Sequence, residues 1–210
     1  MPPISTLLVF LAATLTLNVT PGPDMLYVLA RSASEGRKAG FVSAFGIAMG
    51  GLVHTFAIAA GLSGMLMAVP FAFAVVKYAG AAYLVFLGLK SLLSKVPATL
   101  QAPVVERARM GAIFRQGIVT SVLNPKVALF FLAFLPQFVD PARGAVTGQF
   151  VLLGVMFNVS GTLVLACVAW VASGAGRWTK QRLGGTPWFQ RVTGAVFVGL
   201  GLRLALLERK

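Results

Sequence analysis

Two short stretches that contain proline carry the residues best suited to chemistry. The first, Asn18-Val-Thr-Pro-Gly-Pro-Asp24, places a carboxylate inside an apolar segment, and the second, Asn124-Pro-Lys126, places an ammonium group inside another. The chain has only five Asp and Glu residues, and an ionisable group within an apolar segment costs enough free energy to indicate a functional site. A carboxylate and an ammonium group around one water-filled cavity would suit a zwitterion, because each of its charges would meet an opposite charge.

The first stretch is predicted to divide one membrane-spanning helix into two. Pro21 and Pro23 lack amide donors and clash with a preceding helical turn, so one helix should end near Asn18. The next helix is predicted to begin at Pro21 with Thr20 as its N-cap, because these residue types favour those positions. The free backbone amides around Gly22 then need protein, water or substrate as partners, since lipid offers none.

The second stretch is predicted to break a later helix in the same way, with Asn124 as the cap and Pro125 as the first helical residue. Lys126 then lies at a helix N-terminus, where the helix dipole disfavours a cation by about 0.3 to 1 kcal/mol. Burial in the membrane adds at least ~2.5 kcal/mol. Asp24 is the acid expected to compensate. Two interpretations stay open: the two charges share a substrate cavity, or they form a permanent ion pair that only fixes the packing.

The predicted site takes its polar groups from both breaks. The carboxylate of an amino acid would meet the amide ends and Lys126, and its ammonium group would meet Asp24. Asp24 and His54 are the candidates for proton coupling, because histidine titrates near neutral pH. The alternative for His54 is a hydrogen bond across a helix contact, beside Gly46 and Gly50. The predicted substrate-binding residues are Asn18, Thr20, Pro21, Gly22, Asp24, Asn124, Pro125, Lys126 and Asn158.

The composition is that of an integral membrane protein. The chain is 58% hydrophobic and 11% charged, with a mean hydropathy of +0.86, and a soluble domain of this composition could not cover its surface with polar groups. Residues 41–76 and 144–176 contain no charged residue, and each run exceeds the ~18 apolar residues that indicate a spanning helix. A soluble all-helical protein is therefore not expected.

Several function classes are not supported by the inventory of residues. The net charge of +13 comes from Lys and Arg scattered between apolar segments, so nucleic-acid binding is not predicted. Cys167 and His54 are each the single residue of their type, and neither an HExxH motif nor an aspartate pair is present. We therefore predict no enzyme, no metal and no cofactor.

Hydropathy predicts an all-α polytopic membrane protein with six transmembrane helices. Three connections between the predicted helices are basic: the first carries Arg31, Arg37 and Lys38, the second spans residues 95–109 and the third spans residues 177–182. They alternate along the chain with helix ends of low charge. They are predicted to be cytoplasmic, which puts both termini in the periplasm. The N-terminal apolar run lacks a basic n-region, so it is predicted to be a retained first span. The predicted spans are residues 4–30, 40–64, 70–93, 112–139, 145–173 and 189–207.

The two halves of the chain resemble each other. Lys77-x-x-Gly80-Ala81-x-Tyr83 in the third span matches Arg191-x-x-Gly194-Ala195-x-Phe197 in the sixth, and Gly50-x-x-x-His54 in the second matches Gly154-x-x-x-Asn158 in the fifth. Because each half has three spans, the copies are predicted to form inverted repeats with a site near the bilayer midplane. The predicted units are a first repeat at 1–93, a cytoplasmic linker at 94–111 and a second repeat at 112–210.

The chain resembles the LysE-type translocator family, in particular its homoserine and threonine exporter branch. The stretches that carry the resemblance are the two proline motifs together with Gly50 to His54, Lys77 to Lys90 and Phe114 to Phe138. The resemblance implies an exporter of amino acids or their derivatives in the bacterial inner membrane, with about six helices, proton exchange and a homodimer. The alternatives are a channel-like or non-transporting membrane subunit and an exporter of another small polar metabolite. A channel would need a lining ring or a filter, and the sequence shows neither.

Overall fold

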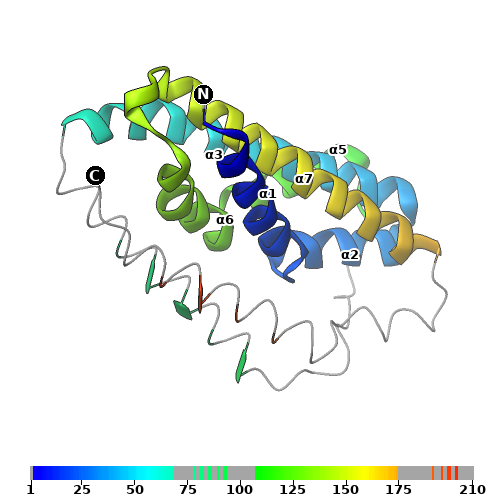
Figure 1. Cartoon of the computed structure of the whole chain (residues 1–210). Coiled ribbons are helices and arrows are strands. Elements are labelled where there is room, and N and C mark those ends of the chain that lie inside the picture. Colours follow the sequence, from blue (N-terminus) through cyan, green and yellow to red (C-terminus); the bar gives the residue numbers. More distant parts are fainter. Residues whose placement is uncertain are drawn as a thin grey trace.

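The computed structural model describes residues 2–68 and 107–174, with isolated positions between 78 and 93 and between 191 and 202. Within these residues the secondary structure is entirely helical (Figure 1). The predicted third and sixth spans and most of the predicted linker lie outside the described ranges. The elements are α1 (Ile4–Val19), α2 (Pro23–Glu35), α3 (Arg37–Ala68), α5 (Met110–Val122), α6 (Pro125–Leu129), the π-helical η1 (Phe130–Phe134), the 3₁₀ helices η2 (Leu135–Phe138) and η3 (Pro141–Arg143), and α7 (Val146–Gly174).

Among the described residues, α3 and α7 are long and apolar enough to cross a membrane, over Arg37–Gly61 and Val146–Gly174. Two further pairs qualify if each bent pair is one span: α1 with α2, bent by 52°, and α5 with Pro125–Phe138, bent by 43°. The bends lie at the two proline motifs, where the sequence predicts interrupted helices. The all-helical prediction is thus confirmed for the described residues, with two to four candidate spans.

The first break differs in detail from its prediction. α2 begins at Pro23 rather than at Pro21, and Gly22 precedes it in an extended conformation with φ −160°. Thr20 is not the N-cap, because Gly22 occupies that position and Thr20 is the C-cap of α1. Its Oγ1 donates to the Thr16 carbonyl oxygen at 2.7 Å. Thr20 and Pro21 therefore belong to an extended link between the two helices.

The second break follows its prediction. Asn124 Oδ1 accepts a hydrogen bond of 3.0 Å from the Lys126 amide, and Pro125 is the first residue of α6. Asparagine is a good cap and proline loses nothing at the first helical position, since its missing amide would have no helical partner there. The winding then changes from α in α6 to π in η1 and to 3₁₀ in η2.

The helix α3 packs backbone to backbone against α5 through glycines (Figure 1). A Cβ atom at Gly46 would lie 2.3 Å from the Phe114 carbonyl oxygen, and one at Gly117 would lie 2.9 Å from the Ser43 carbonyl oxygen. Only glycine permits helices to approach this closely. The expectation that Gly46 and Gly50 admit a neighbouring helix is confirmed, because Gly50 also lies against α5, at Ile118. α3 and α5 are thus in close backbone contact, and α7 packs against a different part of the α3 surface, which includes Gly51.

Aromatic side chains fill the end of the molecule where α1 begins and η2 ends. Phe10 of α1 and Phe138 of η2 meet edge to face with ring centroids 5.1 Å apart, and Phe130 lies 5.2 Å from Phe157 of α7. Such pairs contribute about 0.5 to 1.5 kcal/mol beyond burial of their area. The largest buried members of this cluster are Phe10, Phe130, Phe131, Phe134 and Phe150.

Candidate functional site

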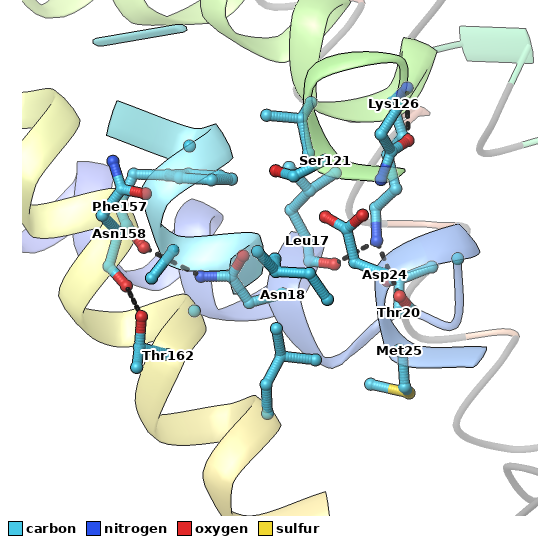
Figure 2. Close-up of a pocket in the computed structure, with 18 residues that line it drawn as sticks. Leu17, Asn18, Thr20, Asp24, Met25, Ser121, Lys126, Phe157, Asn158 and Thr162 are labelled. Carbon is cyan, nitrogen blue, oxygen red and sulfur yellow. Dashed lines mark hydrogen bonds between the residues drawn. The ribbon is translucent and has the colours of Figure 1, made fainter. Parts of the chain in front are cut away.

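A cavity of about 40 Å³ lies where the two breaks meet, between α1, α2, α3, α6 and α7 (Figure 2). A buried water needs about 10 to 15 Å³ of such space, so the cavity holds on the order of three waters. All predicted substrate-binding residues except Pro21 and Pro125 line the cavity; they are Asn18, Thr20, Gly22, Asp24, Asn124, Lys126 and Asn158.

Asp24 lies in the first turn of α2, where the helix dipole favours a negative charge. Its Oδ1 atom is buried and has no hydrogen-bond partner among the described residues. The Asn124 side chain is near enough to hydrogen-bond the carboxylate group, and Lys126 and His54 are near enough to interact with it electrostatically. Figure 2 shows the carboxylate beside the Lys126 side chain, with Asn18 and Ser121 nearby. A buried acceptor without a donor costs about 1 to 3 kcal/mol, so this carboxylate is suited to an incoming cation.

Lys126 binds the end of α1 rather than Asp24. Its Nζ atom donates to the carbonyl oxygens of Leu17 at 2.7 Å and Thr20 at 2.6 Å. The ion pairs within the described part of the chain are Arg31 with Glu35 and Arg143 with Asp140, so the direct Asp24 to Lys126 ion pair, one of the two interpretations left open, is not formed there. The carboxylate is still close enough to attract the ammonium group electrostatically, and the carbonyl oxygens at the end of α1 carry the negative end of its dipole.

Two of the three asparagines that line the cavity, Asn18 and Asn158, are held by α7 and α3. Asn18 donates from Nδ2 to Ser160 Oγ at 3.1 Å. Asn158 donates from Nδ2 to Thr55 Oγ1 and to the Gly154 carbonyl oxygen, both at 2.9 Å. Each amide therefore uses its donors for the protein and keeps its oxygen for other contacts. Together with the Asp24 carboxylate, these oxygens make the cavity richer in acceptors than in donors.

His54 does not line the cavity. Its Nε2 lies 3.1 Å from the carbonyl oxygen of Ser121 on α5, and a carbonyl oxygen only accepts, so Nε2 carries a proton in this contact. The ring also lies 5.8 Å from the Phe131 ring. This geometry agrees with the interpretation of a histidine bonded across a helix contact. Its role in proton coupling stays a prediction.

Some residues of the cavity were not predicted from the sequence. Thr162 lies one turn after Asn158 on α7 and donates to the Asn158 carbonyl oxygen at 2.7 Å, and its four-residue spacing was the available signal. Met25, Ile47 and Leu165 add an apolar wall from three different helices, and no sequence pattern relates them. No group of three His, Cys, Asp or Glu residues able to hold a metal occurs in the described ranges.

Substitution of Gly51 by alanine is expected to lower the thermal midpoint of the detergent-solubilised protein. A Cβ atom at Gly51 would lie 1.9 Å from Asn158 Oδ1, so the amide would have to leave its hydrogen bonds. The cost of overpacking, about 1 to 3 kcal/mol, exceeds the gain of about 1 kcal/mol in helix propensity. The control is Gly61→Ala, where no atom lies within 4 Å of the new Cβ and the midpoint should not fall. Equal midpoints for both variants would contradict the close contact.

Comparison with known proteins supports a transporter. The LysE type translocator family model matches residues 15–208, which includes both proline motifs. An uncharacterised membrane protein of Pseudomonas aeruginosa is 35% identical over 191 residues, or 88% of each chain. Proteins named leucine efflux protein in Salmonella choleraesuis and Salmonella typhimurium are 30% identical over 203 residues, covering 95% of this chain and 94% of theirs. No solved structure matches the chain.

These matches extend over nearly the full length of the chain, and they agree with the membrane-spanning character of α3 and α7. They also agree with the prediction that the chain is not an enzyme, because members of a translocator family move a solute. This protein belongs to the LysE-type translocator family.

Proposed function

We propose that this protein exports an amino acid or a close derivative through the cavity between the two breaks. The observation that carries the proposal is the buried Oδ1 of Asp24 at the start of α2, an acceptor that has no donor among the residues the structure describes. The ammonium group of the substrate would bind this carboxylate. Relatives named leucine efflux protein support an amino acid as the substrate.

The carboxylate of the substrate would bind the opposite set of groups. An ammonium group has three N–H donors, and Lys126 uses two of them for the carbonyl oxygens of Leu17 and Thr20. The third donor and the first amides of α2 are the natural partners for an anion. The side-chain oxygens of Asn18 and Asn158, whose amide groups donate to the protein, would instead accept hydrogen bonds from the substrate ammonium group. Met25, Ile47 and Leu165 would contact an apolar side chain.

The proposed architecture has six spans in two inverted repeats, residues 1–93 and 112–210, with a linker at 94–111. Two bent pairs, one from each half of the chain, support this arrangement, because interrupted helices in corresponding positions form the sites of many secondary transporters. The proposed location is the bacterial inner membrane with both termini in the periplasm, since the basic connections should stay in the cytoplasm. The working unit would be a homodimer.

Export would be driven by exchange for protons, with Asp24 or His54 as the titrating group. A proton on Asp24 would remove the charge that holds the substrate ammonium group, so the two would compete for one carboxylate. The electrostatic interaction between His54 and Asp24 supports a shared role. This exchange would release the substrate where the proton concentration is higher.

Transport by purified protein in proteoliposomes tests the proposal. Vesicles loaded with one of a panel of labelled neutral, acidic and basic amino acids would receive an imposed pH gradient. We expect faster release of one or more neutral amino acids than from protein-free vesicles, and faster release with the gradient than without it. Release of a different polar solute while every amino acid is retained would contradict the proposed substrate class.

A further inference from the structure

A second set of ionisable groups lies at the far end of α2, away from the cavity. Arg31 and Glu35 form an ion pair within α2, and their side chains are only 7% and 6% exposed. Arg31 Nη2 also donates to Gln116 Oε1 on α5 at 2.8 Å. The sequence places Arg31 in a basic connection, but the structure places it inside α2 with 5% of its surface exposed. We call Tyr27, Arg31, Glu35 and Gln116 the α2–α5 latch.

Two further contacts join the same elements. Tyr27 OH donates to the Ile113 carbonyl oxygen of α5 at 2.8 Å, and Glu35 Oε2 accepts from the Ala108 amide at 3.0 Å, just before α5 begins. The Arg31 guanidinium group lies 5.7 Å from the centre of the Tyr27 ring. The latch therefore connects one side of α2 to α5 over a little more than two helical turns, from Tyr27 to Glu35.

The latch is a costly way to hold two helices together. Removing a carboxylate and a guanidinium group from water costs several kcal/mol per ion, and apolar residues of similar volume often hold helices as well or better. Stability alone therefore gives a weak reason for a buried ion pair at this place. A polar contact has a different advantage, because its groups can exchange protein partners for water when the helices separate.

The latch supplements a thin apolar layer. Between the cavity and the latch lies a cluster of small or medium side chains, whose buried members are Val28, Ala44, Ile47, Leu165 and Ala169. At the opposite end of the cavity the cluster is larger and includes Phe10, Phe130, Phe134 and Phe138. At the latch end, closure of the cavity therefore depends less on apolar packing than it does at the phenylalanine end, and more on the position of α2.

α2 is the element best able to change its position. The extended link Thr20 to Gly22 joins it to α1, and Gly36 joins it to α3 with φ +89°, a conformation that side-chain-bearing residues rarely adopt. Glycine contacts fix α3 against α5, as described above for Gly46 and Gly117. Both ends of α2 are thus breaks in helical structure, whereas its neighbours α3 and α5 are interlocked.

We propose that the α2–α5 latch is the gate between the cavity and the aqueous phase on the basic side of the molecule, which is the cytoplasmic side by the distribution of Lys and Arg. The latch breaks when α2 separates from α5 and reforms before substrate leaves on the other side. This inference rests on the proposed transport through the cavity, but it does not depend on which solute is carried.

Accessibility of one cysteine in the cavity tests the gate. The parent variant would carry Thr162→Cys, a position that lines the cavity, together with Cys167→Ser to remove the exposed native thiol. Inside-out membrane vesicles, without any amino acid, would be treated with a membrane-impermeant thiol reagent. We expect Glu35→Gln to raise the alkylation rate about tenfold, which corresponds to about 1.4 kcal/mol of lost closure. Right-side-out vesicles should show no increase.

Two further variants make the result decisive. Gln116→Leu removes the hydrogen bond from Arg31 to α5 and leaves the ion pair of α2 and the Tyr27 to Ile113 contact in place. It should therefore raise the rate by about threefold even if Glu35→Gln fails to fold. Asp140→Asn breaks the exposed ion pair with Arg143 in η3, whose side chains are 47% and 50% exposed, and should leave the rate unchanged. Equal rates in the parent and both latch variants would overturn the gate. Faster labelling from both sides would also overturn it, because that result indicates general loosening of the fold.

Discussion

Asp24→Asn is expected to reduce amino-acid efflux from proteoliposomes by about a hundredfold while the protein stays folded. Hydrogen bonds to a charged group are worth about 1.5 to 3 kcal/mol, and 1.4 kcal/mol is a factor of ten. The Oδ1 atom has no partner among the described residues, so the substitution removes no contact of that atom within the protein. An amide in this place would no longer pair with an ammonium group, and the loss should fall on transport rather than on stability.

The matched control for Asp24→Asn is the same exchange at Asp140, which is exposed and lies in the η3 region outside the cavity. Asp140→Asn should transport at the rate of the unmodified protein, and both variants should elute from a sizing column at the same volume. The pH dependence gives a second measurement. If the residual efflux of Asp24→Asn kept its full dependence on the pH gradient, Asp24 would not be the coupling group and His54 would remain as the candidate.

Lys126→Met is expected to lower the thermal midpoint of the protein and to abolish transport. The Thr20 carbonyl oxygen would lose the donor that binds it at 2.6 Å, and the Leu17 carbonyl oxygen would keep only the Thr20 amide at 3.1 Å. An unpaired buried acceptor costs about 1 to 3 kcal/mol. Methionine fills a similar volume, so a cavity would not add to this cost. The variant therefore isolates the hydrogen bonds of the ammonium group.

Lys38→Met serves as the control for Lys126→Met, because Lys38 is exposed near the start of α3. Its thermal midpoint and transport rate should match those of the unmodified protein. Lys126→Arg is a useful comparison, since it keeps a positive charge and donors but must fit beside Gly22, where a Cβ atom would lie 3.2 Å from the Lys126 side chain. A Lys126→Met variant as stable as the unmodified protein would show that the end of α1 finds other donors.

The breaks in the helices could be predicted because they depend on neighbouring residues. Asn124 caps α6 and Pro125 begins it as expected, since both preferences act within one turn. At the first break the same reasoning misplaced the helix start by two residues, since α2 begins at Pro23 and Thr20 is instead the C-cap of α1. Pro21 and Pro23 both suit the first position of a helix, so local preferences did not decide between them.

The contacts between distant segments could not be predicted in the same way. Lys126 was expected to need an acid, but its partners are backbone carbonyl oxygens of α1, which every residue has and no sequence motif identifies. Arg31 was interpreted as a residue of a basic connection, although it bonds to Gln116, 85 positions further along the chain. A pairing over that distance follows from how the helices pack, and composition does not contain this information.

The change of winding after α6 gives its span an adjustable length. An α-helix rises about 1.5 Å per residue and a 3₁₀ helix about 2.0 Å, so rewinding the four residues of η2 (Leu135–Phe138) as α-helix would shorten the segment by about 2 Å. Each residue would also turn by about 20° less around the axis than it does now, because an α-helix has 3.6 residues per turn and a 3₁₀ helix has 3.0. Phe138, the last residue of η2, would then rotate about the helix axis relative to Phe134. Its edge-to-face contact with Phe10 would therefore change without loss of helical structure.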